Sequence, residues 1–341
     1  MNGYERIQAA LEGRQPDCIP VMLHNFMMAA HEAGYSMAEF RNDPRKIAKS
    51  FIRAIETYNY DGILIDIDTV TLAGAVGVPV DFPVNSPARS VVGCLASLDD
   101  LEKLSRIDIG KYKYVQIWLE AVSLLKSHFK NEIYIRGNCD QAPFSLASMM
   151  RTAQEWYLDL IINEKKAFKL LDYCTEVVYQ FIELMSGSGA DMLSNGDSPA
   201  GPELISPEMY ARFALPYEKR VVEKAHQYGL PYALHICGNT DIILERMIES
   251  GADALELDHK TNARKAHEIL GSKTTFIGNI DPSAVLTHGS VDEVKQKTEE
   301  IIAIFADTPR FILNAGCAIP PAAPSANIHA MIKTARQHTA V

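Results

Sequence analysis

Cysteine is scarce and scattered in this sequence. The 341 residues include six cysteines, none of which forms a Cys-x-x-Cys pair. They are Cys18, Cys94, Cys139, Cys174, Cys237 and Cys317. A small secreted scaffold would need a denser disulfide framework, and a structural zinc site normally uses two closely spaced ligand pairs. We therefore expect reduced thiols and a cytoplasmic protein.

Long apolar runs and basic clusters are also missing. No stretch approaches the roughly 18 apolar residues of a membrane span, and residues 1–14 are polar and amphipathic, without the apolar core of a signal peptide. The formal net charge is −10, and no run of lysine and arginine stands out. These features argue against a nucleic acid or a membrane as partner. With 47% hydrophobic and 22% charged residues, the composition is that of a soluble globular protein.

Short apolar runs alternate with longer amphipathic segments along the whole chain. The short runs predict eight strands, at 19–24, 62–68, 132–136, 191–195, 231–236, 254–257, 275–278 and 310–314. The amphipathic segments predict helices at 2–12, 44–58, 101–130, 144–160, 164–187, 206–228, 240–251, 262–271, 291–306 and 325–336. Asp43, Thr240 and Asn262 are the expected N-caps of three of these helices.

Eight strands, each followed by helix, are typical of an α/β protein with a (β/α)8 TIM barrel. We expect a single domain over residues 1–341, with an N-terminal helical extension and loop insertions. A doubly wound open sheet is the alternative. It is less consistent with eight regular units and with the lack of a glycine-rich phosphate fingerprint after the first strand.

A His-x-Cys pair ends the fifth predicted strand, and a third candidate ligand follows the eighth. Residues i and i+2 of a strand point to the same face, so His235 and Cys237 point together. Cys317 also follows a strand-like run. Two sulfurs and one nitrogen are the three protein ligands of a catalytic zinc, which keeps a fourth position for water or substrate. The alternative is two buried core thiols and a hydrogen-bonded core histidine.

The barrel prediction favours the metal site, because the carboxyl ends of all eight strands converge on one mouth where chemistry takes place. Cys18, Cys94 and Cys174 do not lie at such ends and are expected to be core thiols. Cys139 is a rival ligand. The other polar residues predicted at the mouth are Asp197 and Asp258, as catalytic candidates, and Asn279, Asp66, Asp68 and Asn138, as substrate-binding candidates. Asp258 is also the best oxygen candidate for the fourth metal position.

Five segments make the chain resemble the uroporphyrinogen decarboxylase superfamily almost from end to end. They are 204–207 (Leu-Ile-Ser-Pro), 215–219 (Leu-Pro-Tyr-Glu-Lys), 235–239 (His-Ile-Cys-Gly-Asn), 278–282 (Gly-Asn-Ile-Asp-Pro) and 316–320 (Gly-Cys-Ala-Ile-Pro). Within that superfamily, His-x-Cys with a distant cysteine resembles the branch of zinc-dependent methylcobamide:coenzyme M methyltransferases. The resemblance implies a (β/α)8 barrel, with His235, Cys237 and Cys317 as zinc ligands.

The same resemblance implies the reaction and its partners. A methyl group would pass from a methyl-corrinoid (cobalamin), held by a corrinoid-binding protein, to a zinc-activated thiol such as coenzyme M. Candidates for seating the corrinoid are Met27, Met28, Val78 and Phe82, and candidates for a sulfonate are Arg89, Arg136 and Lys260. The decarboxylases carry an arginine-rich segment after the first strand that grips substrate carboxylates. Residues 24–31 contain no arginine, which argues against decarboxylation.

Two other functions remain open at this point. The protein could work in the opposite direction, taking a methyl group from an O- or N-methylated compound and passing it to a corrinoid protein, with the metal polarising the leaving group. It could also be a metal-free decarboxylase-like enzyme, or a non-catalytic protein that binds a corrinoid or porphyrin. Zinc content and the direction of methyl transfer distinguish the three.

Overall fold

Eight parallel strands form the centre of the molecule in a computed structural model that describes residues 1–338. The strands are hydrogen-bonded in sequence order from β1 to β8, and a parallel bridge between Val21 and Leu313 joins the first strand region to the last. This arrangement confirms the barrel and rules out the doubly wound open sheet. The strands are β1 (Met22–Leu23), β2 (Gly62–Ile65), β3 (Tyr134–Gln141), β4 (Met192–Gly196), β5 (Tyr232–Ile236), β6 (Ala254–Leu257), β7 (Thr275–Ile280) and β8 (Phe311–Ala315).

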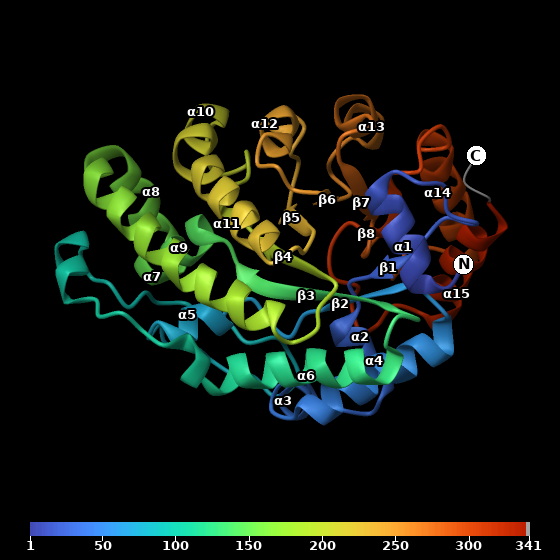
Figure 1. Ribbon diagram of the computed structural model, residues 1–341, viewed down its shortest axis with the longest axis horizontal. Coiled ribbons are helices and arrows are strands. Elements are labelled where there is room, and N and C mark those ends of the chain that lie inside the picture. Colours follow the sequence, from blue (N-terminus) through green and yellow to red (C-terminus); the bar gives the residue numbers. More distant parts are fainter. Residues whose placement is uncertain (339–341) are drawn as a thin grey trace.

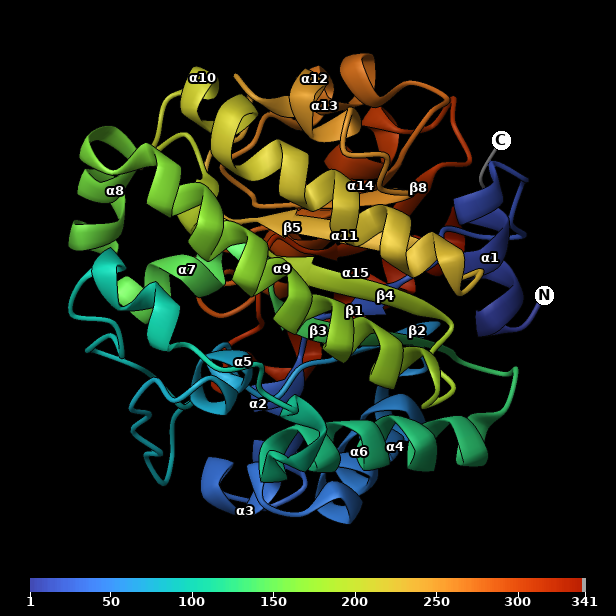
Figure 2. The ribbon, with the colours of Figure 1, turned by 60° about the vertical axis from the view of Figure 1, so that its left-hand side comes forward.

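Helices surround the barrel on its outer side (Figures 1 and 2). The longer ones are α1 (Gly3–Glu12), α4 (Pro44–Tyr58), α6 (Lys113–Phe129), α7 (Pro143–Arg151), α8 (Ala153–Ile162), α9 (Glu164–Ser186), α11 (Leu215–Gln227), α13 (Ala263–Leu270), α14 (Val291–Ile304) and α15 (Ser325–Gln337). The shorter ones are α2 (Phe26–Glu32), α3 (Met37–Arg41), α5 (Thr71–Ala75), α10 (Pro207–Met209) and α12 (Leu244–Ile248). None of the helices within residues 1–338 has the length and apolar character needed to cross a membrane.

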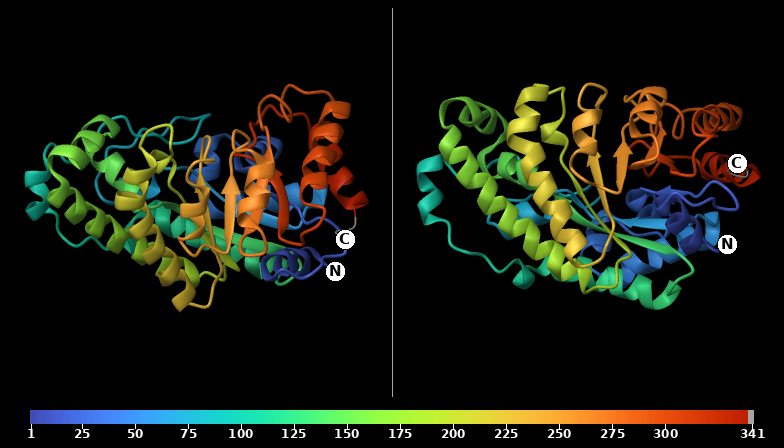
Figure 3. Two further views of the ribbon diagram at one scale, coloured as in Figure 1. Left: turned by 90° about the horizontal axis from the view of Figure 1, so that it is seen from above. Right: turned by 45° about the horizontal axis from the view of Figure 1, so that its top comes forward.

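Helix α1 covers the end of the barrel where the strands begin (Figure 3, left). Its apolar face, including Ile7 and Leu11, packs against the first inward-facing side chains of the strands, among them Met22, Tyr134 and Ile312. A capping box between Asn2 and Glu5 fixes the start of this helix. The Asn2 side chain accepts from Glu5 N–H, and the Glu5 side chain accepts from Asn2 N–H. With this end sealed, only the opposite end can admit a ligand.

Four strands differ from their predicted lengths by two residues or more. The second was expected over 62–68 but ends at Ile65, and the seventh was expected over 275–278 but continues to Ile280. The first was expected over 19–24, but only Met22 and Leu23 form a strand. Pro20 has no N–H to donate, so it can contribute only its carbonyl, which accepts from Leu313 N–H at 2.9 Å. The third was expected to end at 136 but continues to Gln141. Its pairing with β4 shifts between Asn138 and Gln141, and Asp140 has φ +60°, so a bulge carries the strand into a region that we predicted as loop.

Several predicted helices are shorter or broken. The helix expected over 101–130 begins only at residue 113, preceded by two 3-10 turns (Leu98–Lys103 and Ile109–Lys111). The helix expected over 206–228 contains a π turn (Tyr210–Ala214) just before Pro216, whose ring removes a helical N–H. The segment 240–251 is helical only over α12, because the Thr240 hydroxyl bonds the Thr261 hydroxyl (2.9 Å) instead of capping a helix. Asp43 and Asn262 are confirmed as N-caps.

Candidate metal centre

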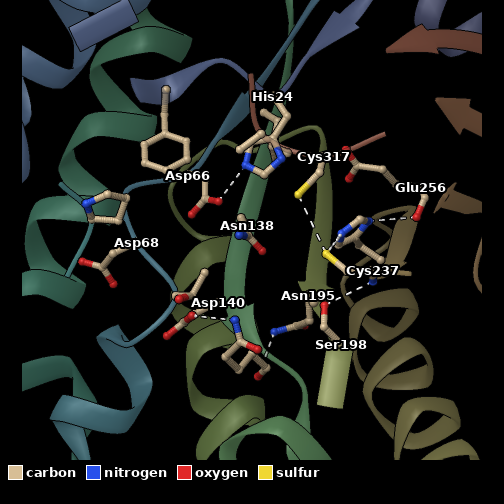
Figure 4. A pocket seen from close by; sticks show the side chains of 18 of the residues that line it. His24, Asp66, Asp68, Asn138, Asp140, Asn195, Ser198, Cys237, Glu256 and Cys317 are labelled. Atoms are coloured by element: carbon tan, nitrogen blue, oxygen red, sulfur yellow. Dashed lines mark hydrogen bonds and ion pairs between the residues drawn. The ribbon is translucent and has the colours of Figure 1, made fainter. Parts of the chain in front are cut away.

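His235, Cys237 and Cys317 lie together at the open end of the barrel. His235 is near the end of β5, Cys237 directly follows it, and Cys317 follows β8. Each of the three offers one ligand atom, and these atoms all lie within 4.8 Å of one another. The His235 Nε2 to Cys237 Sγ distance is 3.0 Å and the distance between the two sulfurs is 3.8 Å (Figure 4).

The loops that carry these side chains are fixed by backbone contacts. Gly238 has φ +88°, a conformation that favours glycine, and its N–H donates to Asp258 Oδ2 (2.8 Å). Cys237 N–H donates to Ser198 Oγ (3.2 Å). Gly316 packs so closely on the Asp258–His259 backbone that an added Cβ would lie 3.0 Å from Asp258 C and nearer still to His259 N. The positions of both cysteines are therefore set by neighbouring strands.

The donor set fits a zinc ion. His235 Nδ1–H donates to the Glu256 carbonyl (2.9 Å), which orients the ring and leaves Nε2 facing the sulfurs. Two sulfurs at about 2.3 Å from a tetrahedral zinc are separated by about 3.8 Å, the separation found between Cys237 and Cys317. Three protein donors would leave one position for a further ligand, as at catalytic zinc sites.

The three groups also shift one another's protonation. The hydrogen bond from the Cys317 thiol, together with nearby His235, lowers the pKa of Cys237 to about 3. Burial alone would lower the pKa of His235, but the neighbouring Cys237 thiolate raises it to about 10. The bond with Cys237 and burial raise the pKa of Cys317. In the absence of metal, the cluster therefore holds one thiolate, and a cation placed among the donors would favour a second.

A cavity of about 310 Å³ opens beside the cluster. This is the lower end of the size range of small-molecule sites. Figure 4 shows Cys237, Cys317 and Glu256 along one side, and Asp66, Asp68 and Asp140 along the other. Residues that line the space between them include Asn138, Asn195 and Ser198.

A buried ion pair forms part of the cavity lining on the side of the cysteines. Arg136 Nη2 lies 2.7 Å from Glu256 Oε2, and both side chains are no more than 2% exposed. Asn314 Nδ2 donates to the other Glu256 oxygen (2.9 Å). Burial would raise the pKa of Glu256, but the Arg136 guanidinium lowers it, so this carboxyl is ionised. Glu256 was not predicted as a site residue, although a charged side chain inside the apolar run of β6 is a signal that could have identified it.

The substrate-binding residues predicted from the sequence divide into two groups. Asp66, Asp68 and Asn138 line the cavity. Asp66 accepts from His24 Nε2 (2.8 Å), a partner that the sequence did not indicate. Asn279 is not part of the cavity lining, and its side-chain amide donates to the Asp258 and Thr261 carbonyls, where it ties two loop segments together.

The catalytic candidates and the rival ligand lie outside the cluster. Asp197 is fully buried and accepts from the backbone and hydroxyl of Ser145 (2.9 and 2.6 Å); burial raises its pKa to about 6. Asp258 accepts from Gly238 N–H and Lys260 N–H, and neither aspartate is part of the cavity lining. Cys139 is fully buried and is not part of the ligand group.

The candidates for corrinoid and sulfonate contacts are scattered. Met27 and Arg136 line the cavity, while Met28 and Val78 are buried in the core. The others lie on the surface: Phe82 stacks on Tyr114, Arg89 pairs with Asp81, and Lys260 pairs with Glu203.

Comparison with known proteins gives consistent results along the chain. The family model described as uroporphyrinogen decarboxylase matches residues 2–338. A methylcobamide:CoM methyltransferase of Methanosarcina acetivorans is 26% identical over 338 residues, covering 98% of this chain and 97% of its own. A uroporphyrinogen decarboxylase of Trichodesmium erythraeum is 28% identical over 296 residues, covering 84% and 80%. The solved structure of a methyltransferase from Methanosarcina mazei superposes with a TM-score of 0.91 at 23% identity, covering 99% of both chains, and so has the same fold.

Proposed function

The chain belongs to the uroporphyrinogen decarboxylase family, and we propose that it is a zinc-dependent methyltransferase. It moves a methyl group from a methyl-corrinoid, carried by a corrinoid-binding protein, to the sulfur of a small thiol. The observation that carries this proposal is the cluster of His235, Cys237 and Cys317 beside a cavity at the open end of the barrel. The methylcobamide:CoM methyltransferase of Methanosarcina acetivorans, which matches over nearly its full length, supports the choice of reaction.

The electrostatics of the cavity argue against decarboxylation of a porphyrinogen. That substrate carries several carboxylates, and its binding needs several cations. Of the described residues that line the cavity, only Arg136, His24 and His235 can be cationic. Arg136 and His24 are each paired with a carboxylate, and His235 contacts the Cys237 sulfur at 3.0 Å. The segment after β1 forms α2 and contains no arginine. An anion with many charges would therefore find no cation in this lining whose charge is not already balanced.

The residues of this chain would hold zinc and leave it accessible to the thiol. His235 and the two cysteines are the protein ligands, with the ring of His235 oriented by the Glu256 carbonyl. When bound, zinc would supply Lewis-acid stabilisation of the substrate thiolate, which is the nucleophilic form of a thiol. Two cysteinates and a neutral imidazole balance the charge of Zn²⁺.

The chemical balance of the reaction is simple. The thiol proton is released to solvent, a bond forms between sulfur and the methyl carbon, and the cobalt–carbon bond breaks. The electron pair of that bond stays on cobalt, which leaves as Co(I). Because α1 closes the other end of the barrel, the corrinoid can approach only from the mouth, where Met27 lies in the cavity lining.

A methyl-transfer assay tests this proposal. Zinc-replete protein is mixed with methylcobalamin and 2-mercaptoethanol, and the methyl thioether is measured by mass spectrometry while the loss of methylcobalamin is followed by absorbance. We expect both signals, and we expect Cys237→Ala to abolish them. No thioether with any small thiol, but methylation of Co(I) cobalamin by a methyl ether or methylamine, would overturn the proposal in favour of the opposite direction.

A further inference from the structure

The cavity wall that faces the two cysteines carries three carboxyl groups among its other lining residues (Figure 4). Asp66 and Asp68 follow β2, and Asp140 is in β3. All three are at most 3% exposed. Most of their oxygens already have partners: Asp66 accepts from Ile67 N–H and His24, and Asp140 accepts from Leu72 N–H at 2.7 Å.

Asp68 differs from its neighbours because one of its oxygens is free. Its Oδ1 accepts from Val70 N–H and the Thr71 hydroxyl, both at 3.0 Å. Its Oδ2 is buried and has no hydrogen-bond partner among residues 1–338. A buried acceptor without a donor is costly, and a ligand that supplies the donor recovers that cost. Burial also raises the pKa of Asp68, so a cation beside it would favour its ionised form.

The positive groups near the cavity are already engaged. His24 contacts Asp66 at 2.8 Å. Arg136 leaves Nε and Nη1 without partners among the described residues, but its charge is balanced by Glu256 at 2.7 Å. Arg41 does not line the cavity and donates to the backbone carbonyls of Pro83 and Ser86.

The resulting charge balance disfavours an anionic ligand. The cavity lining holds four carboxyl groups, Asp66, Asp68, Asp140 and Glu256, and three side chains that can be cationic, His24, Arg136 and His235. Each of these three already contacts an acidic partner: Asp66, Glu256 and Cys237, respectively. A sulfonate beside Arg136 would also meet the Glu256 carboxylate, and a sulfonate beside the opposite wall would meet the three aspartates. Beside Arg136, the ionised Glu256 opposes a sulfonate in a medium of low dielectric. Burial raises the pKa of Asp68 and Asp140 and so favours their neutral forms, and the opposite wall therefore offers a sulfonate no positive charge.

Resting on the proposed function, we infer that the thiol substrate carries an ammonium group, not a sulfonate, at the end remote from its sulfur. The sulfur faces Cys237 and Cys317, and the ammonium donates to Asp68 Oδ2 on the opposite wall. This assigns Asp68 as the residue that determines specificity. The relative from Methanosarcina acetivorans is named as a methylcobamide:CoM methyltransferase, so this assignment gives the present chain a different methyl acceptor.

Three two-carbon thiols test the inference, because they differ only in the remote group. Cysteamine carries an ammonium, 2-mercaptoethanol a hydroxyl and coenzyme M a sulfonate. We would measure kcat/KM for methyl transfer from methylcobalamin to each, and the dissociation constant of each by calorimetry with the zinc-replete protein. We expect cysteamine to exceed coenzyme M by at least about tenfold in both, the usual value of a charge-assisted hydrogen bond.

The three thiols also differ in intrinsic reactivity. Comparing each variant with the wild type, using the same thiols, cancels that difference. Asp68→Asn keeps the shape but removes the charge, and we expect it to lower the preference for cysteamine over coenzyme M about tenfold or more. Asp81→Asn is the control for removal of one carboxylate elsewhere, because Asp81 lies beyond α5 in the same β2–β3 connection, is exposed, and pairs with Arg89 outside the cavity lining. We expect it to keep the wild-type preference.

The possible outcomes separate the two proposals. A preference for coenzyme M in the wild type, or an unchanged preference in Asp68→Asn, would overturn the ammonium assignment while leaving thiol methylation intact. A sulfonate preference would point instead to Arg136 Nε and Nη1, which have no hydrogen-bond partner within residues 1–338. No transfer to any of the three thiols would overturn the proposed function itself.

Discussion

The substitution Gly316→Ala tests whether the position of Cys317 is set by backbone packing. The new Cβ would lie 3.0 Å from Asp258 C and closer to His259 N, both backbone atoms that cannot rotate away. Ordinary contact distances of about 3.5–4.0 Å require the segment to withdraw by roughly 1 Å. Zinc–ligand distances tolerate only about 0.2 Å. We therefore expect Cys317 to move out of ligand range and zinc affinity to fall by at least about tenfold, as for supporting residues of other metal sites.

Competition with a chromophoric chelator measures that affinity, and circular dichroism checks that the barrel is retained. Gly187→Ala is the matched control, because its new Cβ would meet only Leu184 O at 3.5 Å, an ordinary contact. A Gly316→Ala protein with wild-type zinc affinity would refute the reasoning. It would show that the loop after β8 adapts without moving the cysteine.

Three further predictions concern individual side chains. Cys317→Ala should remain folded but lose bound metal, whereas Cys174→Ala, whose thiol is buried in α9, should keep full metal content by atomic absorption. Arg136→Met should lower the free energy of unfolding by about 3–5 kcal/mol in urea, because it leaves Glu256 charged and buried; adding Glu256→Leu should recover much of this loss. The folded-state pKa of Asp197, about 6, lies above its ordinary value, so its contribution to stability is complete below about pH 4 and lost as the pH rises through 6. Metal-free Asp197→Asn should therefore lack this decline in urea titrations between pH 4 and 7, and a decline equal to that of the wild type would contradict the assignment.

The strand order and the ligand cluster could be predicted from the sequence because both depend on local rules. Alternation of short apolar and long amphipathic runs indicates a barrel, and the carboxyl ends of its strands must converge. His235 and Cys237 share a strand face by their spacing, and Cys317 follows a strand that lies on the same barrel. None of these steps needs knowledge of exact register.

The rest depends on details that the sequence leaves open. The pairing of Arg136 with Glu256 joins β3 to β6 across the barrel interior and requires the register of the whole sheet. Asp197 follows a strand as Asp66 does, but it turns to bond Ser145 at the start of α7 and leaves the cavity. Thr240 is a good N-cap by residue type, yet a threonine from another loop takes its hydroxyl. In each case a tertiary contact overrides a local preference.

The most direct test of the account is the metal content of the protein purified without chelator or added metal, measured beside His235→Ala. His235 supplies the nitrogen of the cluster, and its removal leaves only two sulfurs, fewer than a zinc site requires. We predict about one zinc per chain in the wild type and little in the variant, with both proteins folded. Absence of zinc from the wild type, even after dialysis against the metal, would contradict the proposed mechanism.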